Sequence, residues 1–259
     1  MQLQGRSALV TGAANGIGRA IALGMAEAGA DVAASDLDKA NVSTLKAEIE
    51  AFGRKCLAIE ADAGDVAAID SMISQTVEAF GKLDIIVNNA GVTRRAHIME
   101  LTEEDFDKIN RVNAKGVFFC MQRAATEMIK QGGGRIINIA SIAGKGFAGS
   151  SNVIYAGTKG AVISMTRLAS VQLGPHNINV NAVCPGVTET AIYDEIMASD
   201  SAKLGIPEAE VRDRALEKIP LRRGNTPKDI ADMCVFLASN AARNVSGQSL
   251  HVDGALVPD

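Results

Sequence analysis

The chain has 259 residues, of which 47% are apolar and 22% charged, as in ordinary globular proteins with a large core. Its net charge of −4, with no basic run, argues against a nucleic-acid-binding surface. No stretch is apolar enough to span a membrane, and the N-terminus lacks the apolar region of a secretory signal, so we expect a cytoplasmic protein. The cysteines and histidines lack ligand spacing, which predicts no metal site.

Short apolar runs alternate with helical patterns along the chain. Strands are predicted at 7–12, 31–36, 55–62, 83–91, 134–141, 178–186 and 248–255. Helices are predicted at 17–29, 39–53, 66–81, within 103–134, at 154–174 and at 227–239. This alternation predicts an α/β fold of the Rossmann type, a doubly wound, seven-stranded, mostly parallel sheet with helices on both faces. Without a linker or repeat, we expect one domain over residues 1–259.

The least regular segment, residues 188–224, follows the sixth predicted strand. Sites in open α/β sheets lie beyond the carboxyl ends of the strands. A long excursion at this place therefore predicts a lid or substrate loop.

The first predicted strand ends in the turn TGAANGIG, which opens the next helix. Its glycines are Gly12, Gly16 and Gly18, in the spacing GxxxGxG. Glycine allows a tight turn and a close approach of backbone to a pyrophosphate, whose charge suits a helix N-terminus. Ordinary strand–helix turns use glycine too, but the place between a strand and a helix favours a dinucleotide site.

Asp36 ends the second predicted strand, about 20 residues beyond the glycine turn, where a carboxylate accepts hydrogen bonds from ribose hydroxyls and repels a 2′-phosphate. The first basic residue beyond it is Lys39, and Arg19 is the one basic residue near the turn. We therefore predict NAD as the cofactor in preference to NADP. The alternative is an aspartate that only caps a turn.

Tyr155 and Lys159 stand four residues apart in VIYAGTKGAVISMTR, so they share one face of a predicted helix. A free tyrosine has a pKa of about 10, too high for an efficient base at neutral pH, and a nearby ammonium lowers it. The hydroxyl of Ser141, at the end of the fifth strand, can hydrogen-bond a developing alkoxide. The alternative is a chance pair on a buried helix.

The segments TGAANGIG, NNAG, NRVNAKG, NIAS, YAGTK and CPGVTET occur in the order and rough spacing of the short-chain dehydrogenase/reductase family. The chain resembles this family over essentially its whole length. The resemblance implies an NAD(P)-binding oxidoreductase. It makes Tyr155 the acid/base and Lys159 its partner, with Ser141 holding the substrate oxygen and Asn113 maintaining a path for water and protons.

The resemblance also implies which residues line the cofactor. They are Gly12, Asn15, Gly16, Ile17, Gly18, Asp36, Asp62, Ala63, Asn89, Tyr155, Lys159, Val187, Thr188 and Thr190. Ser141 and Tyr155 are 14 residues apart, where many members have 13. We place the extra residue in the loop 144–153, where it would reshape the substrate pocket.

The substrate is predicted to contact Ser141, Tyr155, Arg94 and Tyr193. Arg94 and Arg95 follow NNAG directly and are either an anion clamp or a solvated surface pair. The segment 188–224 resembles the substrate loop of family members that act on sugars, polyols and small diols. Its few large apolar residues argue against a bulky apolar substrate.

The leading hypothesis is an NAD-dependent dehydrogenase that oxidises a secondary alcohol or hemiacetal hydroxyl of a sugar, polyol or diol. One alternative is a carbonyl or 3-oxoacyl reductase that uses NAD(P)H, and a remote one is a non-catalytic nucleotide-binding regulator.

Helices 103–131 and 154–174 are apolar over more than one stripe, which indicates a second buried face. In the family these two helices form a dimer interface, so we expect a homotetramer, a dimer of dimers.

Overall fold

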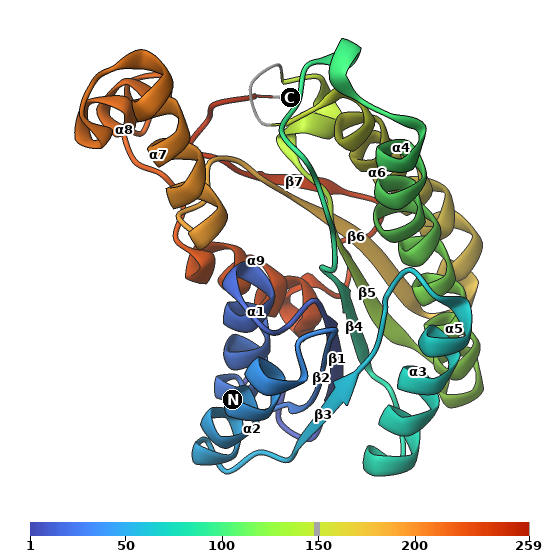
Figure 1. Ribbon diagram of the computed structural model, residues 1–259. Coiled ribbons are helices and arrows are strands. Elements are labelled where there is room, and N and C mark those ends of the chain that lie inside the picture. Colours follow the sequence, from blue (N-terminus) through green and yellow to red (C-terminus); the bar gives the residue numbers. More distant parts are fainter. Residues whose placement is uncertain (148–150, 259) are drawn as a thin grey trace.

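Seven parallel strands form the centre of the computed structural model, which describes residues 1–147 and 151–258 (Figure 1). The order across the sheet is β3-β2-β1-β4-β5-β6-β7. The strands are β1 (Ser7–Thr11), β2 (Asp31–Asp36), β3 (Cys56–Glu60), β4 (Ile85–Asn88), β5 (Gly134–Ile139), β6 (Ile178–Pro185) and β7 (Ser249–Val252). The strand order reverses between β1 and β4, and the predicted fold class is confirmed.

Helices cover both faces of the sheet (Figure 1). On one face lie α1 (Gly16–Glu27), α2 (Lys39–Ala51) and α9 (Pro227–Ala238). On the other lie α3 (Val66–Phe80), α4 (Glu103–Asn110), α5 (Val117–Gln131) and α6 (Val153–Leu173). None of the helices in the described part of the chain has the length and apolarity to cross a bilayer.

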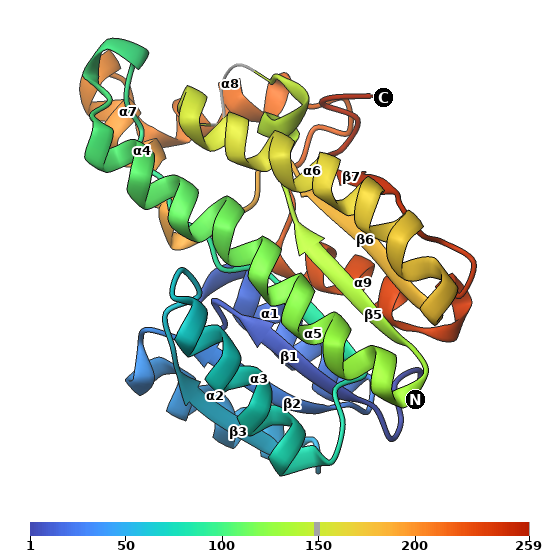
Figure 2. The same cartoon turned by 90° about the vertical axis from the view of Figure 1, so that its right-hand side faces the viewer.

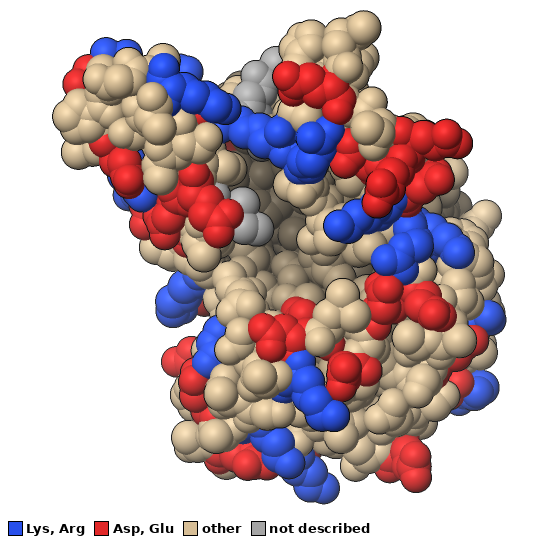
Figure 3. All heavy atoms as spheres, viewed as in Figure 1, with Lys and Arg blue, Asp and Glu red and all other residues tan. Residues whose placement is uncertain are grey.

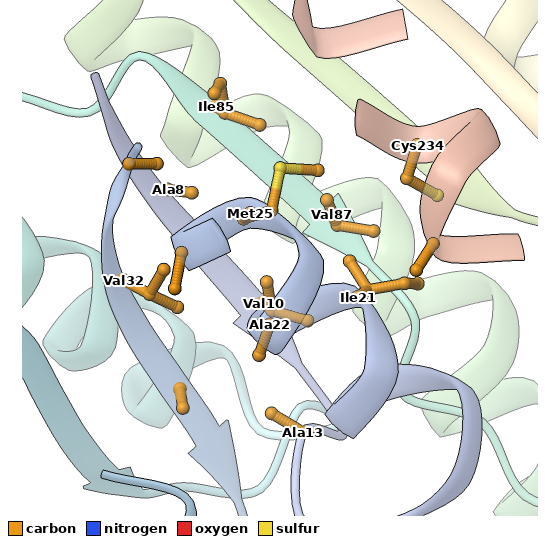
Figure 4. Packing of buried hydrophobic residues seen from close by; sticks show 14 of the residues in the cluster. Ala8, Val10, Ala13, Ile21, Ala22, Met25, Val32, Ile85, Val87 and Cys234 are labelled. Atoms are coloured by element: carbon orange, nitrogen blue, oxygen red, sulfur yellow. The ribbon is translucent and has the colours of Figure 1, made fainter. Parts of the chain in front are cut away.

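Strand β1 shows why the strands read as continuous apolar runs. Successive side chains of a strand point to opposite faces. Ala8 and Val10 pack toward α1, together with Met25 (Figure 4). Leu9 packs into the second core, under α3, α5 and α6. Because both faces are covered, neither can be polar, and the alternation typical of a half-exposed strand is lost.

The region 103–134, predicted as one long helical stretch, is divided in the structure. A six-residue π-helical turn, Arg111–Gly116, joins α4 to α5. The two helices continue along one line beside α6 (Figure 2). Periodicity alone does not distinguish a π-turn from an α-helix, since the turn adds a single residue to the spiral. Asn113 lies in this turn.

The segment 188–224 is more regular than expected. It forms α7 (Ala191–Leu204) and α8 (Glu208–Glu217), which project together from the body (Figure 1). Thr188 and Asn225 form a parallel bridge at its base, and the Asn225 side-chain amide donates to the Val252 carbonyl at 2.6 Å. The excursion therefore begins and ends at one point beside β7. We call residues 189–224 the lid.

Candidate active site

The turn between β1 and α1 is a tight cradle. Gly12 has φ +65°, and a Cβ there would lie 2.8 Å from the Ala90 Cα. A Cβ on Gly18 would lie 2.0 Å from the Gly12 carbonyl oxygen. The Asn89 side-chain amide donates to the carbonyls of Thr11 at 3.0 Å and Gly12 at 2.9 Å. Asn89 thus braces the turn, and glycine is required at both positions.

The N-terminus of α1 faces this cradle. Asn15 is exposed at the N-cap, and its side chain makes no capping hydrogen bond to the described residues. Thr190, at the start of the lid, lies against the turn, since a Cβ on Gly16 would be 3.5 Å from its methyl carbon. Uncapped N–H groups at a helix N-terminus suit an anion. The turn, with Ile17 and Gly18 in the first helical residues, therefore fits a dinucleotide pyrophosphate.

Asp36 closes the cradle at the end of β2. Its two carboxylate oxygens accept from the backbone N–H groups of Ala14 at 3.0 Å and Asp38 at 3.1 Å. These bonds fix the carboxylate before any ribose arrives. Two nearby basic side chains are engaged elsewhere, Arg19 with Glu48 and Lys39 with Glu60.

Asp62 and Ala63 follow β3. Asp62 accepts from the Gly64 N–H and from the Arg111 guanidinium, both at 2.7 Å. Burial acts to raise the pKa of Asp62, but these two hydrogen bonds outweigh it and hold the pKa below its usual range. The sequence analysis missed Arg111, because 49 residues separate the two partners.

Ser141, Tyr155 and Lys159 meet beyond the end of β5. Ser141 is buried, accepts from the Ala143 N–H at 3.1 Å, and shares a hydrogen bond with the Tyr155 hydroxyl. Lys159 is 3% exposed, and its ammonium donates to the Ile139 carbonyl at 2.6 Å. The same Nζ lies 5.6 Å from the centroid of the Tyr155 ring. The structure thus brings the three predicted groups together.

Burial dominates the ionisation of this pair. It raises the pKa of Tyr155, although the hydrogen bond from Ser141 acts in the opposite direction. Burial also lowers the pKa of Lys159 to about 8, against an electrostatic contribution from Cys184 that raises it. In the protein alone, the net direction for Tyr155 is therefore upward, and the lowering by the Lys159 ammonium stays a prediction for the cofactor-bound site. The cost of burying the phenolate exceeds the stabilisation of the phenolate by the Ser141 hydrogen bond.

Asn113 lies in the π-turn, fully buried, and its side chain pairs with the backbone of Val92. Its oxygen accepts from the Val92 N–H at 2.8 Å, and its amide donates to the Val92 carbonyl at 2.9 Å. A Cβ on Gly91 would be 3.4 Å from the Asn113 oxygen and 3.6 Å from the Lys159 Nζ. Asn113 therefore borders the same space as Lys159.

Arg94 lies at the mouth of the site, but its guanidinium is already engaged. It donates to both carboxylate oxygens of Asp105, at 3.0 and 2.8 Å, and to the Glu100 carbonyl at 2.6 Å. This bidentate geometry favours a brace for α4 over an anion clamp, one of the two alternatives left open by the sequence. Arg95 reaches the lid instead and pairs with Asp200 of α7 at 2.9 Å.

The remaining predicted residues lie where β6 leads into the lid. Val187 accepts from the Asn225 N–H at 2.8 Å, and the Thr188 hydroxyl donates to the Gly186 carbonyl at 3.2 Å. The ring of Tyr193 has the Arg212 guanidinium 5.2 Å from its centroid. Its aromatic face is thus occupied by a cation of α8. In the enlarged loop 144–153, residues 148–150 lie outside the described part of the chain.

The fold and site together define the class of protein. A cradle for a dinucleotide lies at the reversal of the strand order. A group formed by Ser141, Lys159 and Tyr155, of which the first two are buried and the third is partly exposed, lies beyond the neighbouring strand β5. Parallel sheets of this kind bind dinucleotides at that crevice. The chain is an oxidoreductase of the class that uses a nicotinamide cofactor.

Comparisons with known proteins identify the family. A family model described as enoyl-(acyl carrier protein) reductase matches residues 12–256. The chain is 42% identical to a short-chain dehydrogenase/reductase of Armillaria gallica, over 99% of this chain and 97% of the relative. It is 39% identical to a 3-oxoacyl-[acyl-carrier-protein] reductase of Thermotoga maritima, over 99% and 100%. A solved NAD+-bound xylitol dehydrogenase shares 29% identity with a TM-score of 0.91, covering 98% of this chain and 100% of that chain. The chain belongs to the short-chain dehydrogenase/reductase family.

Proposed function

We propose that the chain is an NAD-dependent dehydrogenase that oxidises a secondary alcohol or hemiacetal hydroxyl of a small polar metabolite, such as a sugar, polyol or diol. The observation that carries the proposal is the fixed carboxylate of Asp36. Held by the N–H groups of Ala14 and Asp38, it presents negative charge where a 2′-phosphate would have to lie. The similarity to an NAD+-bound xylitol dehydrogenase supports the same choice.

The residues of the site divide the chemistry among them. When bound, NAD supplies the nicotinamide ring that accepts a hydride from the carbinol carbon. Tyr155 takes the hydroxyl proton of the substrate, and Ser141, already hydrogen-bonded to Tyr155, holds the same oxygen. Lys159 stabilises the resulting phenolate by its charge. Asn113, beside Lys159, borders the path by which the proton leaves.

The entrance to the site fits a polar substrate. Figure 3 shows a hollow between the lid and the body, with Lys and Arg side chains along its rim. Of the lid side chains that the structure describes, only Met197 and Val211 are buried apolar residues in α7 and α8. Polar and charged residues outnumber large apolar ones in the sequences of these two helices, which favours a polar substrate over a bulky apolar one. The proposed substrate is therefore small and hydroxylated.

A 3-oxoacyl or other carbonyl reductase is the second candidate, favoured by the identity to the Thermotoga maritima protein. The two candidates use the same catalytic groups but catalyse opposite directions, alcohol oxidation and carbonyl reduction, so cofactor preference separates them. A regulator without catalysis is the remote third candidate, and the buried ammonium of Lys159 beside Tyr155 and Ser141 argues against it, because burying a lysine is costly.

The test is a cofactor-preference assay on the purified chain. NAD and NADP are each offered with a panel of sugars, polyols, diols and hydroxy acids, and a 3-oxoacyl thioester is offered with NADH and NADPH. We expect NAD to be preferred by at least about tenfold in kcat/KM, and Asp36→Ala to lose most of that preference. The Tyr155→Phe variant, which lacks the proposed base, is the negative control for turnover. A large preference for NADPH with the thioester would establish the reductase instead.

We further propose a homotetramer and a cytoplasmic location. Large apolar side chains remain exposed on the outer face of α4, α5 and α6: Phe106, Phe118, Ile129, Leu168 and Val171. Such a face indicates an interface with a second copy. The four cysteines are all buried and form no disulfide in the described part of the chain, which fits a reducing compartment. A light-scattering mass of one chain would contradict the oligomer.

A further inference from the structure

Asn152 is a buried polar residue directly before α6, three positions ahead of Tyr155. Only 4% of it is exposed. Its side-chain oxygen accepts from the backbone N–H of Tyr155 at 2.8 Å, and so forms the N-cap of the helix. The cap is therefore made to the residue that carries the proposed base.

The other end of the same side chain binds a different segment. The Asn152 amide donates to the Arg94 carbonyl at 2.6 Å and approaches the Thr93 hydroxyl at 3.4 Å. Both acceptors belong to the segment Val92–Arg95, which follows β4. Asn152 thus joins the turn that holds Tyr155 to the segment at the mouth of the site.

The segment Val92–Arg95 is itself held by other parts of the site. Val92 pairs with the Asn113 side chain, and Arg95 pairs with Asp200 of the lid. Through Asn152, the first turn of α6 shares one hydrogen-bonded unit with the π-turn and with the lid. The Asn152 side chain at the centre of this unit is almost fully excluded from water.

We propose that Asn152 is a positioning residue for Tyr155, which places the tyrosine hydroxyl against Ser141 and ties it to the segment Val92–Arg95. The proposal rests on the proposed function of Tyr155. An amide is required because the site needs an acceptor and a donor in one buried side chain. Serine would retain the cap, since it is a good N-cap residue, but its hydroxyl is too short to reach the Arg94 carbonyl as well.

Two variants separate the cap from the link. Asn152→Ser keeps the cap and removes the link, and Asn152→Ala removes both. Asp65→Ala is the matched control, because the Asp65 side chain caps α3 through the N–H groups of Ala67 and Ala68. It weakens a helix start that carries no catalytic group. Both Asn152 variants are expected to lower kcat by at least about tenfold with a smaller change in KM, whereas the control leaves kcat unchanged.

A spectroscopic readout tests the placement of Tyr155 without substrate. The chain has two tyrosines and no tryptophan, so Tyr193→Phe leaves Tyr155 as the one tyrosine fluorophore. In that background, acrylamide quenching at neutral pH reports access of small molecules to the ring. We expect Asn152→Ser to increase the quenching constant, because the first turn of α6 loosens, and Asp65→Ala to leave it unchanged.

The outcomes are separable. If Asn152→Ser matches the parent protein in both kcat and quenching, the link has no positioning role and the proposal is overturned. If Asn152→Ala fails to fold, Asn152→Ser still decides. If Tyr155→Phe retains full turnover, the proposed role of Tyr155 fails, whereas the quenching experiment still reports whether Asn152 places the ring.

Discussion

Two buried charged side chains at opposite ends of the sheet, Asp84 and Lys159, respond to folding in opposite ways. At the amino end, Asp84 precedes β4 and accepts from the Ser7 N–H, from Arg6 and from Lys82, at 2.9 to 3.0 Å. Burial acts to raise the pKa of Asp84, but these bonds outweigh it and hold the pKa below its usual range. At the carboxyl end, burial lowers the pKa of Lys159 and raises that of Tyr155.

The difference shows which end stabilises the fold and which serves chemistry. At the amino end the charged form of Asp84 is favoured by folding, so the charge adds stability. At the carboxyl end the charged form of Lys159 is disfavoured, so the buried ammonium costs stability at neutral pH, whereas Tyr155 is neutral in both states there. Perturbed ionisation of this kind is typical of functional sites. Substitutions of Asp84 and Lys159 should therefore have opposite effects on stability.

The largest expected effect is that of Lys159→Met. We expect kcat to fall by about 10² to 10⁴-fold, since the phenolate loses its cation. The melting temperature of the cofactor-free protein should rise, because a buried ammonium is removed. Below pH 8 the lysine is charged in both the folded and the unfolded protein, so burial of the ammonium destabilises the fold by its full amount. Between a pH of about 8 and the unfolded value of about 10.4, the folded protein loses the proton first, and the gain from the substitution declines.

Thermal melts at several pH values, with activity measured in parallel, check this expectation. Arg135→Met also removes a cation that burial disfavours, but far from the active site, so it is the control for activity and should leave kcat unchanged. A lower melting temperature for Lys159→Met at neutral pH would contradict the contrast, because the lysine would then stabilise the fold.

A smaller effect of the opposite kind is expected for Asp84→Asn. The amide cannot accept all the bonds of the carboxylate, so we expect a loss of about 2 to 3 kcal/mol in unfolding free energy with kcat unchanged. Folding lowers the pKa of Asp84. The carboxylate therefore contributes its full stabilisation at pH values above its pKa in the unfolded protein, about 3.9, and this stabilisation is lost as the pH falls through its pKa in the folded protein. Urea unfolding at pH 7 and at pH 3 measures both effects, and equal losses at the two pH values would contradict the account.

The smallest effect is expected at the rim, where Arg95 and Asp200 join the body to the lid. Both side chains are partly exposed, at 47% and 24%, so the pair contributes less than about 1 kcal/mol to stability. We expect Arg95→Ala and Asp200→Ala each to change kcat/KM by about fivefold or less. The double variant should match either single variant, because the two residues share one interaction. If the losses in kcat/KM of the two single variants instead add up in the double variant, Arg95 contacts the substrate independently of Asp200.

The sequence by itself determined the fold class and the identity of the chemical groups. Strand and helix periodicities are local properties of the chain, and the predicted elements agree with the structure to within a few residues at most boundaries. The glycine turn and Asp36 occupy the positions that their spacing predicted, and the Ser141, Tyr155 and Lys159 side chains converge as the strand order requires.

Only the tertiary structure decided the partners and the ionisation of those groups. Arg94 pairs with Asp105, Arg95 with a residue 105 positions away, and Asn152 with both Tyr155 and Arg94. Such pairings depend on where distant segments pack, which no local pattern encodes. The ionisation of Tyr155 also followed from packing, because desolvation by surrounding residues raises its pKa and outweighs the hydrogen bond of Ser141.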